Sequence, residues 1–267
     1  MDHDPVTDEY VGPVGPLVLS GEIFAGDSDA LLSKILADEN RFLAHNKIIV
    51  ASDGGDVVEA LKIAQLVKSL YSSLAVGPLT GRCVSACFFI YAVAAEREVD
   101  GDKLLGINRP FIADNQTLSA TQTSPAKLAA PATDAAVSPV VSVGLTQVRA
   151  FLQDNAVPSY LVDEMFRHGS NDAYWLSADD EKNLGPRSES FKQFLAAKCA
   201  WDEELEREAF AGKRPSEELK QLLKCKDRAT RDAAHQVLLA VRQDRPAQPP
   251  RDAAVKQRAR LPGVPAH

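Results

Sequence analysis

The chain has 267 residues, and its 30 lysines and arginines against 37 aspartates and glutamates give a net charge of -7 at pH 7. Hydrophobic residues make up 45% of the sequence and charged residues 25%, which is ordinary globular usage and excludes a collagen-like or wholly disordered protein. The acidic balance argues against broad nucleic-acid binding, which requires a basic surface.

Neither a membrane span nor a leader is predicted. The longest apolar stretch, residues 86–95, is shorter than the roughly 18 to 20 residues that cross a bilayer. Residues 1–10 are acidic and lack the basic, apolar and small-residue order of a signal peptide. The sequence therefore predicts either a cytoplasmic protein or one whose leader has been removed.

Residues 17–108 alternate short β-rich runs with helical patterns, which is the order of parallel βαβ units in an α/β protein. Asp56 and Glu59 have the spacing of a capping box at the start of one helix. Residues 83–95 are apolar on almost every side, which predicts a helix at the buried centre of the domain. Strands are predicted at residues 17–23, 47–51, 74–79 and 104–108, and amphipathic helices at residues 27–44 and 56–71.

The chain changes in composition after Phe111. Ala, Thr, Ser and Pro then dominate, which predicts a flexible surface insertion at residues 113–144. Tyr174, Trp175 and Leu176 are predicted to be anchored in the core. Further helices are predicted at residues 146–155, 158–167, 188–211 and 215–242. The predicted organisation is a flexible N-terminus (1–16), an α/β domain (17–187), a C-terminal helical hairpin extension (188–242) and a disordered tail (243–267).

Two short stretches could together form an acyl-transfer site. Residues 52–56, Ser-Asp-Gly-Gly-Asp, lie between a predicted strand and a predicted helix, where a glycine pair turns the chain sharply and leaves N–H groups uncovered. Residues 81–87 place Ser85 where a loop enters the apolar helix, and a helix N-terminus favours developing negative charge. The simpler interpretation is that Gly54 and Gly55 make a turn and Ser85 caps a helix.

The order of these features resembles the Clp protease proteolytic subunit superfamily, and especially a periplasmic branch of that Clp-like, crotonase-like fold. The resemblance covers about residues 17–185 and implies a repeated ββα/βαβ core. The matching segments are Ser20-Gly21-Glu22-Ile23, Ser52-Asp53-Gly54-Gly55, Cys83-Val84-Ser85-Ala86-Cys87, Gly106-Ile107-Asn108-Arg109-Pro110 and Tyr174-Trp175-Leu176-Ser177.

The resemblance also implies roles for single residues. Ser85 takes the position of the nucleophile, while Gly55 and Ala86, with Gly54 in the same turn, take the positions of the backbone oxyanion hole. Asn108 takes the position of the general-base histidine, and Asp172 falls near that of the third triad member. Asn108 departs from the family pattern, because a carboxamide has no lone pair basic enough to accept a serine proton.

Three other side chains could replace the missing base. Lys103 is an odd number of residues from Asn108 and so points to the opposite face of a regular strand. His45 lies beside a predicted strand start, and His168 ends a predicted helix, where a histidine usually acts as a helix-end cation.

Four cysteines occur at irregular spacings. Cys83 and Cys87 flank Ser85, and we expect them to be buried free thiols. The alternatives at this spacing are a disulfide, a metal site and a thiol nucleophile. Cys199 and Cys225 lie in the two predicted C-terminal helices, where they could pair in an oxidising compartment or remain free.

The sequence thus predicts a Clp-like serine hydrolase or peptidase homologue that Asn108 makes inactive or weakly active, with a peptide-binding or scaffold role. One alternative is an active serine hydrolase that recruits another base, and a further one is a crotonase-like acyl-CoA enzyme. No cofactor and no metal are expected. The resemblance implies a periplasmic location, with the cytoplasm as the alternative, and assembly into homo-oligomers.

Overall fold

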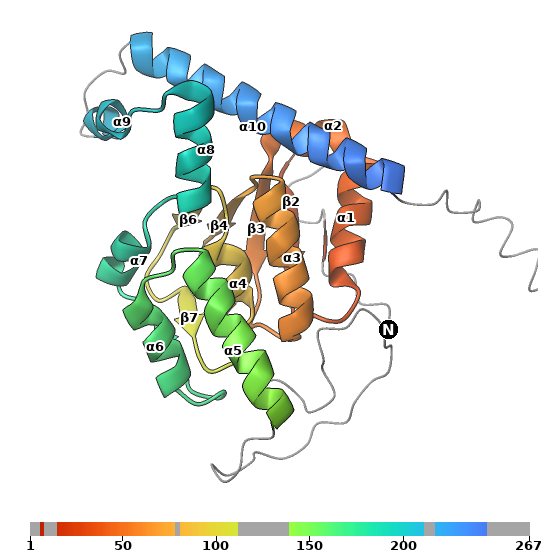
Figure 1. Cartoon of the computed structure of the whole chain (residues 1–267), viewed down its shortest axis with the longest axis vertical. Helices are drawn as coiled ribbons and strands as arrows, with labels where there is room; N and C mark the ends of the chain where they lie inside the picture. The colour runs from red at the N-terminus through yellow and green to blue at the C-terminus, as the bar shows by residue number, and fades with distance from the viewer. Residues whose placement is uncertain (1–5, 8–14, 78–80, 112–138, 211–216, 245–267) are drawn as a thin grey trace, which may run out of the picture.

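The computed structural model describes residues 6–7, 15–77, 81–111, 139–210 and 217–244 (Figure 1). Most of the predicted N-terminal segment, insertion and tail lie outside these described residues. No helix in the described part of the chain is long and apolar enough to cross a membrane.

The core of the molecule is a mixed sheet that is parallel apart from one edge strand. Strand β1 pairs antiparallel with β2, and the remaining strands are parallel in the order β2-β3-β4-β6. The predicted α/β class is therefore confirmed, although the sequence did not indicate β6. The strands of this sheet are β1 (Val6–Thr7), β2 (Leu17–Ser20), β3 (Lys47–Ala51), β4 (Ser73–Val76) and β6 (Arg97–Val99).

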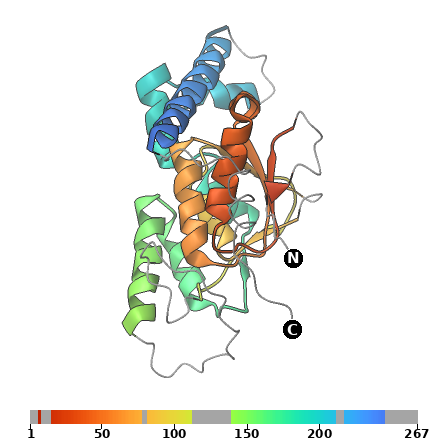
Figure 2. The ribbon, with the colours of Figure 1, turned by 90° about the vertical axis from the view of Figure 1, so that its right-hand side faces the viewer.

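Helices cover one face of this sheet (Figures 1 and 2). The predicted helix at 27–44 is two helices, because Asp38 leaves the helical conformation and its side chain accepts a hydrogen bond from Arg41 N. Asp56 caps the next helix through Glu59 N, as the capping pattern predicted, whereas the Glu59 carboxylate accepts from Ser28 N instead. These helices are α1 (Asp27–Ala37), α2 (Glu39–His45) and α3 (Val57–Ser69).

A second, three-stranded sheet lies next to Ser85 and Asn108, which directly follow two of its strands. Its order is β5-β7-β8, with β5 (Cys83–Val84), β7 (Leu105–Ile107) and β8 (Tyr174–Trp175). The predicted helix at 83–95 is therefore wrong at both ends, and the helix α4 spans Cys87–Ala92. Its start is displaced because Cys83 N and Val84 N donate to Leu104 O and Ser52 O as strand residues. All six residues of α4 are buried, which confirms the predicted central helix.

A buried arginine fastens the chain just beyond α4. Arg97 donates from its guanidinium to the carbonyl groups of Ala92, Leu184 and Arg187. Burial lowers the pKa of Arg97 to about 10, while the nearby Tyr91 acts in the opposite direction. The end of α4 is thus tied to the segment that begins the C-terminal extension.

The extension packs directly against the α/β core. The predicted helix at 188–211 is broken in two, because Ala200 has a positive φ of 47°. In Figure 1 the last helix runs across one end of the molecule beside α2, and its Ala234 and Leu238 belong to the main hydrophobic core. The remaining helices are α5 (Pro139–Asp154), α6 (Ser159–Arg167), α7 (Ala178–Leu184), α8 (Glu189–Cys199), α9 (Glu203–Phe210) and α10 (Glu217–Asp244).

One carboxylate joins α6, β8 and α7. Asp180 is 6% exposed and accepts hydrogen bonds from Tyr160 Oη and Tyr174 Oη, both at 2.9 Å. It also accepts from Ser177 N and Ser177 Oγ at the start of α7. Burial opposes the charge, but these hydrogen bonds outweigh it and lower the pKa of Asp180. The network thus fixes β8, which pairs with β7, and β7 ends at the residue before Asn108.

Replacing this carboxylate should weaken the fold in a pH-dependent way. Asp180→Asn removes the charge, and we expect it to lower the free energy of unfolding at pH 7 by about 2 to 4 kcal/mol. Because the folded pKa is lowered, the stabilisation is present above the unfolded pKa of about 3.9 and is lost as the pH falls through the folded value. The difference from wild type should therefore shrink below about pH 4.

Urea unfolding at neutral and acidic pH measures this difference. Asp179→Asn is the matched control, since Asp179 is the exposed neighbour in the same helix turn. Equal losses in the two variants, or a pH-independent loss in Asp180→Asn, would contradict the assignment.

Candidate active site

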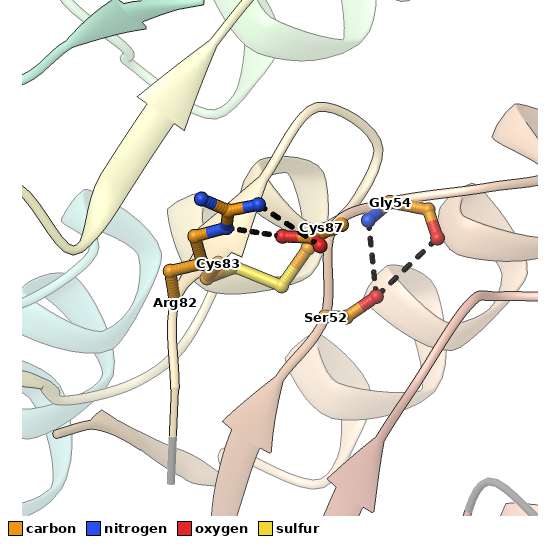
Figure 3. The surroundings of a disulfide bond; sticks show 6 residues. Ser52, Gly54, Arg82, Cys83 and Cys87 are labelled. Atoms are coloured by element: carbon orange, nitrogen blue, oxygen red, sulfur yellow. Dashed lines mark hydrogen bonds and ion pairs between the residues drawn. A yellow bond between two sulfur atoms is a disulfide. The ribbon is translucent and has the colours of Figure 1, made fainter. Parts of the chain in front are cut away.

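The Gly-Gly turn after β3 is held by its own backbone and by Ser52. The buried Ser52 Oγ accepts from Gly54 N at 3.1 Å (Figure 3). Ile23 N donates to Gly54 O, and Asp56 N donates to Ile23 O, so the turn is bonded to the segment after β2. A methyl group on Gly55 would lie 2.2 Å from Ile23 O, which explains why this position requires glycine.

Ser85 occupies the sharp turn between β5 and α4. Its φ is +57°, an uncommon conformation for a residue with a side chain, and its N–H donates to Gly106 O at 3.0 Å. Phe88 N in turn donates to Ser85 O. The Ser85 side chain is half-buried, and within the described residues its hydroxyl has no side-chain hydrogen-bond partner.

The two turns touch through Gly54. A Cβ atom at Gly54 would lie 2.7 Å from Ser85 Cβ, 3.0 Å from Val84 O and 3.1 Å from Ala86 N. Only a hydrogen atom fits between these groups. The structure therefore brings together Gly54, Ser85 and Ala86, three of the residues that the sequence indicated.

The two N–H groups predicted to form an oxyanion hole have no partner in the part of the chain that the structure describes. Neither Gly55 N nor Ala86 N donates a hydrogen bond to a described acceptor. Gly55 lies against Ile23, and Ala86 lies beside Ser85 at the start of α4. N–H groups without an intramolecular acceptor can bind a carbonyl oxygen or an oxyanion.

Asn108 follows β7 directly and is 7% exposed. Its side-chain Nδ2 donates to Ser170 O at 2.6 Å, which turns the N–H end of the amide toward the loop after α6. The other end, Oδ1, is buried without a partner among the described residues. The Asn108 side chain therefore carries one buried acceptor and no basic group.

Asp172 does not contact Asn108. Its exposed carboxylate pairs with His168 Nδ1 at 3.3 Å, and His168 Nε2 faces Glu164 Oε2 at 3.4 Å. Both ring nitrogens of His168 are thus directed at carboxylates. The four-residue spacing of His168 and Asp172 is the sequence signal from which this pairing could have been predicted.

The other two candidate bases lie elsewhere. Lys103 is exposed in the turn before β7, where its φ is +55°. His45 is the exposed last residue of α2. Among the described residues, no group of three or more His, Cys, Asp or Glu side chains could hold a metal ion.

A disulfide encloses the Ser85 turn. Cys83 and Cys87 are joined, with their Cα atoms 5.3 Å apart, so the expectation of free thiols at this pair is wrong. The pairing is possible because the turn at Ser85 brings the end of β5 back to the start of α4, within the usual Cα range of a disulfide. Cys199 and Cys225 are also joined, which settles the choice that the sequence left open.

An exposed ion pair bridges the same two turns. Arg82 Nε donates to Asp53 Oδ1 at 2.5 Å, and Arg82 Nη2 donates to Asp53 Oδ2 at 3.1 Å (Figure 3). The hydrogen bond from Arg82 lowers the pKa of Asp53. Arg82 also lies over the Trp175 ring, 5.6 Å from its centroid. Asp53 and Arg82 lie within the two predicted motifs, residues 52–56 and 81–87, but the pair itself was not predicted.

Comparisons with known proteins give a similarity of fold. No protein-family model matches the sequence, and no curated protein matches it. Eleven solved chains match the structure. A membrane-bound stomatin-specific protease matches 69% of this chain and 83% of its own, with 12% sequence identity and a TM-score of 0.41.

Two further solved structures that match are a Clp protease subunit and a crotonase-type protein. ClpP1 from Listeria monocytogenes matches 64% of this chain and 86% of its own, with 16% identity and a TM-score of 0.41. A proposed enoyl-CoA hydratase/isomerase from Bordetella parapertussis matches 97% of this chain and 99% of its own, with 15% identity and a TM-score of 0.39. No residue role is taken from these matches, and the assignment of the site rests on the contacts described above.

The contact between Gly54 and Ser85 can be tested by adding one methyl group. Gly54→Ala combines an unfavourable φ of +103° with a clash against Ser85 and the backbone, and we expect it to cost about 2 to 5 kcal/mol of unfolding free energy. Gly26→Ala is the matched control, because Gly26 has a φ of +100° and open space around the added Cβ. It should cost only the strain, about 1 to 3 kcal/mol.

Urea unfolding of both variants measures the difference. Equal destabilisation of the two would show that Gly54 is required for its φ alone and would contradict the close packing against Ser85.

Proposed function

We propose that this chain is a Clp-like serine hydrolase homologue that binds a peptide at Ser85 and hydrolyses it very slowly or not at all. The observation that supports this most directly is the state of Asn108, whose N–H end is bonded to Ser170 O. A serine hydroxyl is a weak nucleophile at neutral pH unless a neighbouring base accepts its proton. With an amide at the base position, Ser85 lacks that acceptor.

Of the polar groups present at the site, two backbone N–H groups are suited to binding a peptide, and the Asn108 amide is not a base. Gly55 N and Ala86 N donate to no acceptor among the described residues, and a substrate carbonyl oxygen is a suitable acceptor for such groups. Asn108 Oδ1 is a buried acceptor, and an unpaired buried acceptor costs about 1 to 3 kcal/mol. A peptide carbonyl oxygen is suited to the two N–H groups, whereas the buried Asn108 Oδ1 is closed to a ligand in this structure.

Residual catalysis fits the same arrangement. A hydrolase that lacks a triad member retains roughly 10³ to 10⁴-fold rate enhancement over water from its oxyanion hole and from binding. The proposal therefore allows slow peptide hydrolysis at Ser85, while peptide binding is the main function of the site.

An active serine hydrolase is the second candidate, and the pair of His168 and Asp172 favours it. This pair lies on the segment that Asn108 contacts, since Arg109 N donates to His168 O and Asn108 to Ser170 O. His168 could accept a proton from Ser85 only after Nε2 leaves the Glu164 carboxylate. The second candidate therefore requires a rearrangement of the loop after α6.

The two disulfides support a proposed location in an oxidising compartment such as the periplasm. Disulfides persist outside the reducing cytosol. One disulfide lies at the candidate site and the other joins α8 to α10, so both halves of the described chain carry one. Self-association stays a prediction from the family resemblance.

Restoring a base should restore reactivity. We expect a fluorophosphonate probe to label Ser85 weakly in the native protein, and Asn108→His to increase the labelling rate by about 10² or more, the typical contribution of a general base. Asn108→Gln is the matched control, because it keeps a carboxamide and should give no increase. Ser85→Ala should abolish any labelling in every background.

Rapid labelling of the native protein that is lost in His168→Gln would overturn the proposal and establish the second candidate. Calorimetric binding of an acyl-CoA, without binding of any peptide, would instead favour a crotonase-like enzyme.

A further inference from the structure

We propose that the Cys83–Cys87 disulfide is a positioning device for Ser85, which holds the serine and the Ala86 N–H in their orientation toward the Gly54 turn. The proposal rests on the proposed function of Ser85 as the residue that faces the ligand. It adds to that function a requirement for an oxidised pair of cysteines at the site.

The disulfide closes a ring around the serine. Cys83 lies in β5, Cys87 is the first residue of α4, and Ser85 is the middle residue of the five. The positive φ of Ser85 is unfavourable for a residue with a Cβ atom and persists only where the surroundings impose it. A covalent link between the residues two before and two after Ser85 imposes it directly.

The link lies on the buried side of the turn. Cys83 and Cys87 are both 0% exposed, whereas the side chains of the Arg82–Asp53 ion pair are more than half exposed. In the view of Figure 3 the disulfide lies between Arg82 and the turn of Ser52 and Gly54. An exposed ion pair is a weak constraint because solvent screens it, so the disulfide is the strong one.

The short loop that this disulfide closes also distinguishes it from a cross-link that mainly stabilises the whole fold. Its cysteines are 4 residues apart, whereas Cys199 and Cys225 are 26 residues apart. The stabilisation gained by restricting the unfolded chain grows with loop length, so the longer loop gains more. The effect of the Cys83–Cys87 link is therefore expected on the local conformation more than on global stability.

Two backbone hydrogen bonds report on the Ser85 conformation. Ser85 N donates to Gly106 O, and Phe88 N donates to Ser85 O, both at 3.0 Å. If the disulfide holds the turn, Cys83→Ala/Cys87→Ala should accelerate hydrogen exchange at these two amides at least tenfold. Exchange at Leu74 N, which donates to Glu96 O in the main sheet, should be unchanged.

Cys199→Ala/Cys225→Ala is the matched control, because it removes the other disulfide and leaves the Ser85 turn intact. It should lower the unfolding midpoint without accelerating exchange at Ser85. No acceleration in the site variant, or the same acceleration in the control, would overturn the proposal.

A second measurement applies if the site variant does not fold. The control variant holds a single disulfide. Because both sulfur atoms are buried, it is reduced in urea with a water-soluble phosphine, which gives two thiols and the phosphine oxide with oxygen from water, and the protein is then refolded with the phosphine present. Exchange at Ser85 should then rise on reduction, and unchanged exchange in the fully reduced, folded protein would overturn the proposal.

Labelling separates this proposal from the proposed function. In the Asn108→His background, loss of the site disulfide should reduce fluorophosphonate labelling of Ser85 at least tenfold, and loss of the Cys199–Cys225 disulfide should leave it unchanged. If labelling is unaffected while exchange rises, the disulfide does not position the hydroxyl and the inference fails. If Asn108→His gains no labelling at all, the proposed function is at fault, and the exchange measurement still decides the role of the disulfide.

Discussion

The contact between the Gly54 backbone and Ser85 is the constraint on which the candidate site depends. A hydrogen atom stands at Gly54 where any other residue would place a carbon 2.7 Å from Ser85 Cβ. The two turns reach this distance because the strands before them are joined, with Ser52 N bonded to Arg82 O and Val84 N bonded to Ser52 O. The close approach is therefore built by the sheets, and glycine permits it.

The site contains groups of two kinds that depend on the fold differently. The N–H groups of Gly55 and Ala86 belong to the backbone, so any sequence that makes these turns supplies them. The proton acceptor has to be a particular side chain, and a single residue change removes it. Asn108 is buried and polar but not basic, so under the proposed function the site has binding groups and lacks a proton acceptor.

The two disulfides act at different scales. The Cys83–Cys87 link encloses one turn, whereas the Cys199–Cys225 link joins α8 to α10. Ion pairs add to the second connection. Glu96, at the start of β6, accepts from Arg187 and from Lys226 of α10. Burial raises the pKa of Glu96, but Lys226 and Arg187 outweigh this and lower it. The extension is therefore fixed to the sheet by charge as well as by apolar packing.

The sequence by itself determined the α/β class, the strand at residues 47–51, the capping of α3 by Asp56 and the buried centre at α4. Each depends on the period of apolar residues or on a cap within one turn, which are local properties. The tertiary structure decided what depends on segments distant along the chain. Residues 83 and 84 form a strand because Leu104 and Ser52 accept their hydrogen bonds, and Asn108 donates to Ser170 O because the loop after α6 lies beside the end of β7. The pairing of cysteines and the meeting of Gly54 with Ser85 likewise follow from distances in space, which spacing along the sequence does not specify.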